Sequence, residues 1–199
     1  MTVPAFPKVY RIPVGKQRLI ERRIMSEGEV ERLLSDPVVI EEKLDGKTVG
    51  TAIIEGYIVY GEFLKWKHSI YYDRLPSWIV AFDVLELKTR RFLNRREKEE
   101  FLSQYRIPAA PLICEAEIAR KEDLIGFLYR RSEFSTRSKI EGVVVKNYRK
   151  QIMGKIVSHE FLTGMEKHWT EKKREMNRLD LSISRPADIA FTLEGWEYA

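Results

Sequence analysis

The chain of 199 residues is 44% hydrophobic and 33% charged, which is typical of a globular protein and excludes a disordered or fibrous one. Its 35 Lys and Arg residues outnumber its 30 Asp and Glu residues, and the net charge of +5 favours a polyanionic partner such as a nucleic acid. The only cysteine, Cys114, excludes an intrachain disulfide and a zinc site built from several cysteines.

The first half of the chain predicts one helix followed by several strands. Residues 26–36 begin with Ser26 and carry apolar residues at helical spacing, so they predict a short amphipathic helix. The next segments are apolar and are bounded by Asp-Gly and Gly turns, which is typical of strands and of a hairpin. These strands are expected at residues 37–46, 46–56, 57–64 and 77–87.

The second half predicts a mixture of both kinds of element. The patterns indicate helices at residues 93–106 and 121–131, strands at 111–118, 139–148 and 154–161, and a basic helix from Leu162 to Leu179. Strands outnumber helices, and most connections are too short for repeated βαβ units. The sequence therefore predicts an α+β fold with two packed, mainly antiparallel sheets, flanking helices and a cleft between the sheets.

The sharpest local signal is the segment Glu42-Lys43-Leu44-Asp45-Gly46. A lysine at the end of a buried strand, directly before a tight turn, is well placed to act as a nucleophile. Asp45 can orient the amine or hold a metal ion, and Gly46 lets a phosphate approach the backbone. A plain hairpin turn explains the same letters, because Asp-Gly is a common turn dipeptide.

Further chemically active residues follow or sit within the later predicted strands. In chain order they are Tyr60-Gly61-Glu62, Ala81-Phe82-Asp83, residues 141–146 (EGVVVK) and residues 154–157 (GKIV). Together they offer acidic groups for a ribose and a magnesium ion, an aromatic face for a base, and lysines for phosphates. The set indicates nucleotide chemistry.

The order of these motifs resembles that of the covalent nucleotidyltransferases, a superfamily of polynucleotide ligases and mRNA-capping enzymes. Longer stretches resemble the ATP-dependent RNA ligases in particular: residues 37–50, 61–86, 141–161 and 168–179. The resemblance covers residues 6–180 and implies a nucleotidyltransferase or ATP-grasp-like ligase domain, an adenylyltransferase, over residues 1–162. It implies a basic helical extension over residues 163–199 that packs on this domain, and no OB-fold domain is expected.

The resemblance also implies a catalytic set. Lys43 would attack the α-phosphate of ATP and carry AMP as a covalent intermediate. Asp45, Glu141 and Lys155 would complete the catalytic residues, and Glu141 and Asp45 would hold the metal ion, Mg²⁺ or Mn²⁺.

The ATP site implied by the resemblance overlaps this set. It comprises Glu42, Lys43, Gly46, Glu62, Phe82, Val144, Lys146 and Lys155. Phe82 and Val144 would cover the two faces of adenine, and Glu62 would bind the ribose. Lys146 and Lys155 would neutralise the α-phosphate and the charge that develops on it.

One departure from the family's pattern concerns the phosphate site. Many relatives carry a second basic residue just beyond the last motif's lysine, whereas Val157 and Ser158 follow Lys155 here. Lys146 or Lys150 would then compensate.

A geometric conflict concerns the EGVVVK segment. Strict strand alternation places Glu141 and Val144 on opposite faces of one strand. Both can reach the same ligand only if the strand twists or bulges.

Four functions remain open from the sequence. The favoured one is an ATP-dependent RNA ligase that joins RNA 5′-phosphate and 3′-hydroxyl ends through lysyl-AMP and an RNA-adenylate. The alternatives are a minimal DNA ligase, a capping-type nucleotidyltransferase and a degenerate nucleic-acid-binding relative. Only 38 residues follow Phe161, too few for the OB-fold barrel that DNA ligases and capping enzymes usually add. The presence of the nucleophile and both key acids disfavours the degenerate relative.

The expected partners follow from this reading. RNA ends are the expected substrate, ATP the co-substrate and Mg²⁺ the metal, with a monomer or homodimer and an accessory RNA-repair protein as a candidate partner. The basic segments Arg11–Arg23 and Lys167–Arg178 are candidate surfaces for RNA phosphates. No apolar stretch suits a signal peptide or a membrane span, which favours a cytoplasmic protein without membrane contact.

Overall fold

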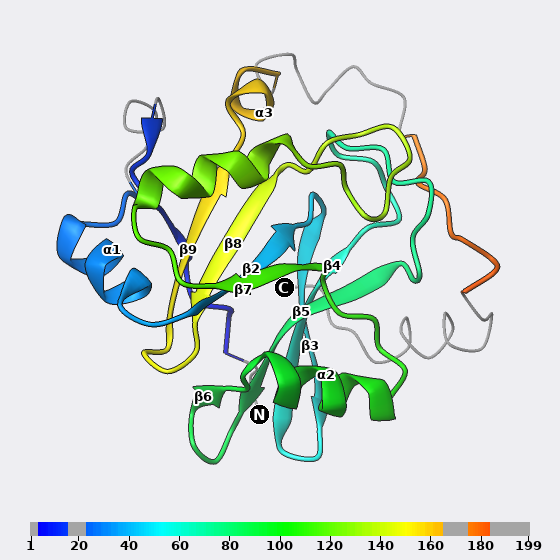
Figure 1. The fold of residues 1–199 in the computed structure, drawn as a ribbon. Coiled ribbons are helices and arrows are strands. Elements are labelled where there is room, and N and C mark those ends of the chain that lie inside the picture. The colour runs from blue at the N-terminus through cyan, green and yellow to red at the C-terminus, as the bar shows by residue number, and fades with distance from the viewer. Residues whose placement is uncertain (1–3, 16–22, 165–174, 184–199) are drawn as a thin grey trace.

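The computed structural model describes residues 4–15, 23–164 and 175–183, and its strands form two sheets (Figure 1). Sheet A consists, in order across the sheet, of β1 (Tyr10–Arg11), β9 (Ile152–Val157), β8 (Gly142–Asn147), β2 (Val38–Lys43) and β7 (Leu112–Ala116). Sheet B consists of β3 (Lys47–Ile54), β4 (Tyr57–Phe63), β5 (Ile79–Glu86) and β6 (Arg91–Phe92). Only the β1–β9 pair is parallel among these neighbours. The predicted α+β fold with two mainly antiparallel sheets is confirmed.

Two helices cover the outer face of sheet A. Helix α1 (Glu27–Leu34) begins at a capping box, in which Ser26 and Glu29 each accept a backbone N–H from the other. It packs on β8 and β9 together with the 3-10 helix η2 (Lys121–Tyr129). The apolar residues of these elements form one core: Ile12, Val14, Met25, Val30, Leu33, Val38, Ile40, Leu124, Ile140, Val143, Val145 and Ile156. Each fully buried aliphatic side chain stabilises the fold by roughly 1.5–3 kcal/mol.

Helix α2 (Arg95–Gln104) covers sheet B, as Figure 1 shows. It begins at a second capping box, formed by Asn94 and Glu97. Its residues Phe101 and Leu102 pack on the sheet B residues Val59, Ala81 and Val84. Because the helices lie on the outer faces, the inner faces of the two sheets face each other across a cleft.

Three predicted elements differ from the structure. Residues 121–129 form a 3-10 helix rather than an α-helix, and its three-residue repeat places Leu124 and Phe127 on the same core. Strand β9 ends at Val157, and helix α3 (His159–Gly164) follows it.

The third difference concerns the predicted helix Leu162–Leu179. Of this predicted helix, only residues 162–164 are helical in the structure, where they form the end of α3, and residues 165–174 lie outside the described residues. Residues 175–179 are not helical, because their backbone pairs with the loop after β4 through Met176 with Trp66 and Leu179 with Leu75. This tertiary pairing outweighs the local helix propensity. Residues 184–199 of the predicted extension also lie outside the described part. Among the described residues, no helix is both long and apolar enough to cross a bilayer.

Candidate functional site

A cavity of about 300 Å³ lies between the two sheets. Both sheets and the N-terminal segment line it with Phe6, Pro7, Val9, Glu41, Glu42, Lys43, Leu44, Thr48, Glu62, Phe82, Asp83, Val144, Lys146 and Lys155. The structure therefore brings together the residues assigned to the ATP site, with the exception of Gly46.

Lys43 and Glu141 form the centre of the site. Lys43 is the last residue of β2 and pairs in register with Gly142 of β8, so Glu141 lies beside it. The Nζ atom of Lys43 is 2.5 Å from Oε2 of Glu141, and the two side chains are 23% and 11% exposed. Burial raises the pKa of Glu141, although the charge of Lys43 opposes this shift. The pair places an amine and a carboxylate with a raised proton affinity in direct contact.

The backbone around Gly142 resolves the conflict between Glu141 and Val144 without a bulge in β8. Glu141 precedes β8, so the alternation that begins at Gly142 does not govern its side chain. A Cβ atom at position 142 would lie 2.1 Å from the carbonyl oxygen of Ile156, so only glycine permits this close approach of β8 and β9. Within β8, Val144 and Lys146 face the cavity, whereas the neighbouring Val143 and Val145 belong to the outer core.

On sheet B, Glu62 of β4 presents a carboxylate to the cavity. Its Oε1 accepts a hydrogen bond from Thr48 at 3.1 Å, and its Oε2 is buried without a hydrogen-bond partner. Burial raises the pKa of Glu62 to about 7, although Lys43 lowers it in part. A buried acceptor without a donor costs about 1–3 kcal/mol, and a ligand hydroxyl would remove that cost.

This raised pKa predicts a pH dependence of stability. Below the ordinary value of 4.5 the carboxyl of Glu62 is protonated in both states, and between 4.5 and about 7 the unfolded chain loses its proton first. The free energy of unfolding should therefore fall as the pH rises, and Glu62→Gln should remove about 3 kcal/mol of this fall. Urea unfolding of both proteins at pH 5 and pH 8 measures the difference. Identical pH dependence in the two proteins would contradict the assignment.

Asp45 and Gly46 lie next to the cavity but do not line it. Oδ2 of Asp45 accepts hydrogen bonds from the backbone N–H groups of Ser69 and Ile70, at 2.6 and 2.8 Å. A Cβ atom at position 46 would lie 2.7 Å from the carbonyl oxygen of Phe63. The geometry thus explains Gly46 by close packing against the end of β4, and it shows Asp45 holding the backbone of Ser69 and Ile70 close to Lys43.

Glu42 lines the cavity, but the hydrogen bonds of its side chain tie it to the segment after η2. Its Oε1 accepts a hydrogen bond from Ser132 at 2.5 Å, and its Oε2 accepts one from the N–H of Glu133 at 3.1 Å. Burial raises the pKa of Glu42 to about 7. These contacts fix the backbone directly before Lys43.

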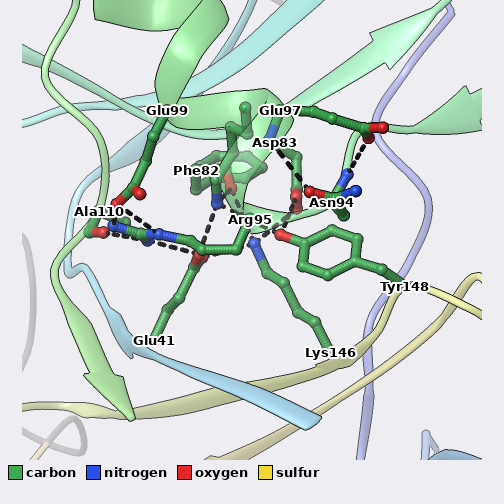
Figure 2. Close-up of polar contacts among 11 residues, drawn as sticks. Glu41, Phe82, Asp83, Asn94, Arg95, Glu97, Glu99, Ala110, Lys146 and Tyr148 are labelled. Atoms are coloured by element: carbon green, nitrogen blue, oxygen red, sulfur yellow. Dashed lines mark hydrogen bonds and ion pairs between the residues drawn. The ribbon is translucent and has the colours of Figure 1, made fainter. Parts of the chain in front are cut away.

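A buried ionic cluster links the two sheets at one side of the cavity (Figure 2). Glu41 of β2 accepts hydrogen bonds from Arg95, Lys98 and Lys146 at 2.7, 2.5 and 2.6 Å. Lys146 also pairs with Asp83 at 2.9 Å and is only 2% exposed.

The same cluster holds the backbone of Phe82. The carbonyl oxygen of Phe82 accepts hydrogen bonds from Lys98 at 2.8 Å and from Lys146 at 2.7 Å. The geometry therefore favours a positioning role for Lys146, which reaches the cavity wall while its ammonium group is held by protein groups. Lys150 lies at the turn between β8 and β9, 4.0 Å from Asp36, at the end of β8 remote from Gly142. Lys150 therefore lies at the opposite end of β8 from the Lys43–Glu141 pair.

Several lining residues were not assigned from the sequence. They are Phe6, Pro7, Val9, Glu41, Leu44 and Thr48, whereas Asp83 was noted within the Ala81-Phe82-Asp83 motif without a role of its own. The burial of both acids could have been predicted, because a carboxylate inside an apolar strand such as VVIEEK or IVAFDV requires a buried partner. No local pattern marks Phe6, whose ring contacts Phe82 edge-on at a centroid distance of 4.8 Å.

The acidic groups at the site suit a hydrated divalent ion. The negative charges of Glu141 and Asp45 each raise the pKa of Glu62, so the three carboxylates lie close enough to repel one another. No group of three such ligands is close enough to enclose a metal within the described part of the chain. Mg²⁺ is commonly bound by one or two carboxylates, waters and substrate phosphates, and this donor set fits that arrangement.

The family follows from a comparison with known proteins. The family described as "RNA ligase" matches residues 50–157, more than half of the chain. The chain belongs to the RNA ligase family. In this RNA ligase family member the matched segment includes Glu62, Phe82 and Lys155, which line the cavity, and Glu141, which contacts the lining residue Lys43.

Solved structures show the same fold. An RNA ligase of Naegleria gruberi with PPi gives a TM-score of 0.63 at 14% identity, covering 83% of this chain and 59% of that chain. A mutant of the Naegleria gruberi RNA ligase with ATP and Mn gives 0.58 at 16% identity, covering 71% and 54%. The family member described here thus spans less than two thirds of the length of these relatives. A comparison with curated protein sequences gave no match.

Proposed function

We propose that this RNA ligase family member uses ATP to join RNA 5′-phosphate and 3′-hydroxyl ends, with AMP carried on Lys43. The observation that carries the proposal is the contact between Lys43 and Glu141 at the edge of a cavity with the chemistry of a nucleotide site. Membership of the RNA ligase family favours RNA over DNA ends. The Naegleria gruberi relatives with ATP and Mn support ATP and a divalent ion as the reagents.

The nucleotide would be held by groups from both sheets. Phe82 on β5 and Val144 on β8 line the cavity from its two sides and would enclose the adenine. The buried Oε2 atom of Glu62 would accept a hydrogen bond from a ribose hydroxyl. Lys155 on β9, the strand next to Val144, would neutralise the α-phosphate.

The first chemical step transfers AMP to the enzyme. Nζ of Lys43 attacks the α-phosphorus, a P–N bond forms, and the P–O bond to pyrophosphate breaks. The proton released by the amine passes to Glu141, whose carboxylate is 2.5 Å away and whose raised pKa suits it to accept a proton. A bound divalent ion would supply charge neutralisation at the phosphates, and Asp45 and the second carboxylate oxygen of Glu141 would hold it.

Two further transfers complete ligation. The 5′-phosphate of RNA attacks the phosphorus of lysyl-AMP, which gives an RNA-adenylate and restores the amine of Lys43. A 3′-hydroxyl then attacks the 5′-phosphate phosphorus of the RNA-adenylate, which forms the new phosphodiester and releases AMP. RNA repair or RNA processing is the corresponding biological role.

Two assays test the proposal. The protein is incubated with Mg²⁺ and ATP or GTP labelled at the α-phosphate, and label that resists denaturation is measured. Nicked duplex RNA, single-stranded RNA and nicked DNA are then offered with ATP. We expect label from ATP and sealing of RNA ends. Label from GTP alone would indicate a capping-type enzyme, exclusive sealing of nicked DNA would indicate a DNA ligase, and no label would overturn the covalent mechanism.

A further inference from the structure

The proposed phosphate site around Lys155 needs more positive charge than Lys155 supplies. Val157, two residues after Lys155, is apolar and is buried at 2% exposure, so it adds no second positive charge beside Lys155. Neither of the two lysines considered as substitutes is well placed, since Lys146 is held by Glu41 and Asp83 and Lys150 lies at the far turn. A triphosphate carries more negative charge than Lys155 can neutralise alone.

Arg11 lies next to Lys155 on the neighbouring strand. β1 pairs with β9 in parallel, with Arg11 in register with Lys155, and the N–H of Ile12 donates to the carbonyl oxygen of Lys155 at 2.9 Å. Register partners on adjacent strands point to the same face of a sheet. Ile12 belongs to the outer core, so Arg11, which precedes it, lies on the opposite face of the sheet, beside the residues that line the cavity although it is not one of them. Lys155 on that face lines the cavity, as does Val9, two residues before Arg11.

Arg11 is the first residue of the basic segment that the sequence suggested as a surface for RNA phosphates, and this end of the segment is buried. Its side chain is only 6% exposed, because β1 lies between β9 and the backbone of residues 23–25, to which Arg11 is hydrogen-bonded. A guanidinium group in such a shielded position interacts more strongly with an anion than one in open solvent does. The rest of the Arg11–Arg23 segment, residues 16–22, lies outside the described residues.

The order of residues across the inner face of sheet A follows the expected order of the parts of ATP. Glu41, Val144, Lys155 and Arg11 form one row, each residue in register with the next. Val144 would lie against the adenine and Lys155 at the α-phosphate, so the next strand, about 4.8 Å further on, lies where the outer phosphates would extend. We propose that Arg11 binds the β- and γ-phosphates of ATP and the pyrophosphate that leaves. The planar guanidinium fork can bind a phosphate through two parallel hydrogen bonds. This inference rests on the proposed function.

The test compares a ligand that has the outer phosphates with one that lacks them. Binding of AMP and of α,β-methylene-ATP, which cannot transfer AMP, is measured by calorimetry with Mg²⁺ for the wild type and Arg11→Gln. We expect the variant to bind the ATP analogue at least about tenfold more weakly and to bind AMP within about twofold of the wild type. The matched control is Arg74→Gln, because Arg74 is an exposed arginine of the loop after β4, and it should change neither affinity.

The outcomes separate this inference from the proposed function. If Arg11→Gln weakens AMP and the analogue equally, Arg11 only supports the fold, and the inference is overturned. If it weakens neither, the inference is overturned as well. A wild type that binds no adenine nucleotide would overturn the proposed function itself. As a second readout, Arg11→Gln should slow lysyl-AMP formation but leave the sealing of pre-adenylated RNA unchanged, because that step involves no pyrophosphate.

Discussion

Replacement of Lys43 by Ala should abolish covalent attachment of AMP, with a loss of about 10⁴-fold or more in the rate of the first step. Nζ of Lys43 lies 2.5 Å from Oε2 of Glu141 at the edge of the cavity, where we propose that it forms the P–N bond. Lys43→Arg should fail equally, because a guanidinium keeps its charge at any accessible pH and so is a poor nucleophile. Intact-mass measurement of protein incubated with ATP and Mg²⁺ detects the added AMP.

Two further variants sharpen this prediction. Lys88→Ala removes an exposed lysine after β5 and should gain AMP as the wild type does. Glu141→Gln keeps the shape of the carboxyl but cannot accept a proton, so it should slow the step by roughly 10²–10⁴-fold. Undiminished AMP attachment in Lys43→Ala would show that another residue is the nucleophile.

Substitution Glu41→Ala should destabilise the fold strongly, by about 3–5 kcal/mol in the free energy of unfolding. Glu41 is 1% exposed and faces the charges of Arg95, Lys98 and Lys146. Burial alone would raise the pKa of Glu41, but the three cations outweigh burial and hold the pKa below its ordinary range. Without this carboxylate, buried cations lose their principal counter-charge. Urea unfolding monitored by fluorescence measures the change.

A matched control comes from an exposed ion pair on helix α2, which also carries Arg95 and Lys98. Glu100 pairs with Arg96 at 2.8 Å, with side chains 61% and 87% exposed. Glu100→Gln should therefore cost no more than about 0.5 kcal/mol. A cost below about 1 kcal/mol for Glu41→Ala would mean that the cluster is compensated by water or by relaxation, and that it does not fix the two sheets.

Local pattern predicted most of the fold because hydrophobic periodicity is a local property. The segment PVVIEEK became β2 and the helix after Ser26 became α1, each within a few residues of the expected bounds. Residues 175–179 escaped prediction because their conformation depends on pairing with a loop about a hundred residues earlier in the chain. Propensity carries no information about such a partner.

The residues of the candidate site also divide into those that motifs predict and those that depend on tertiary contacts. Lys43 and Glu141 could be proposed from the motif order, and the structure places them in contact. The proposed role of Arg11 and the ring contact between Phe6 and Phe82 could not be predicted, because they depend on strand register and on tertiary packing rather than on any motif. Gly46 was assigned to phosphate access, whereas its geometry is explained by packing against Phe63.

The three residues that we propose take part in the reaction, Lys43, Glu141 and Lys155, all lie on or directly beside adjacent hydrogen-bonded strands of sheet A. Lys43 is paired with Gly142, and Gly142 is paired with Val157, two residues from Lys155. The opposing wall, with Glu62 and Phe82, belongs to a separate ladder. Backbone ladders deform less easily than side-chain contacts between layers. The mutual alignment of Lys43, Glu141 and Lys155 therefore depends on backbone hydrogen bonds within sheet A, and not on the side-chain contacts that join the two sheets.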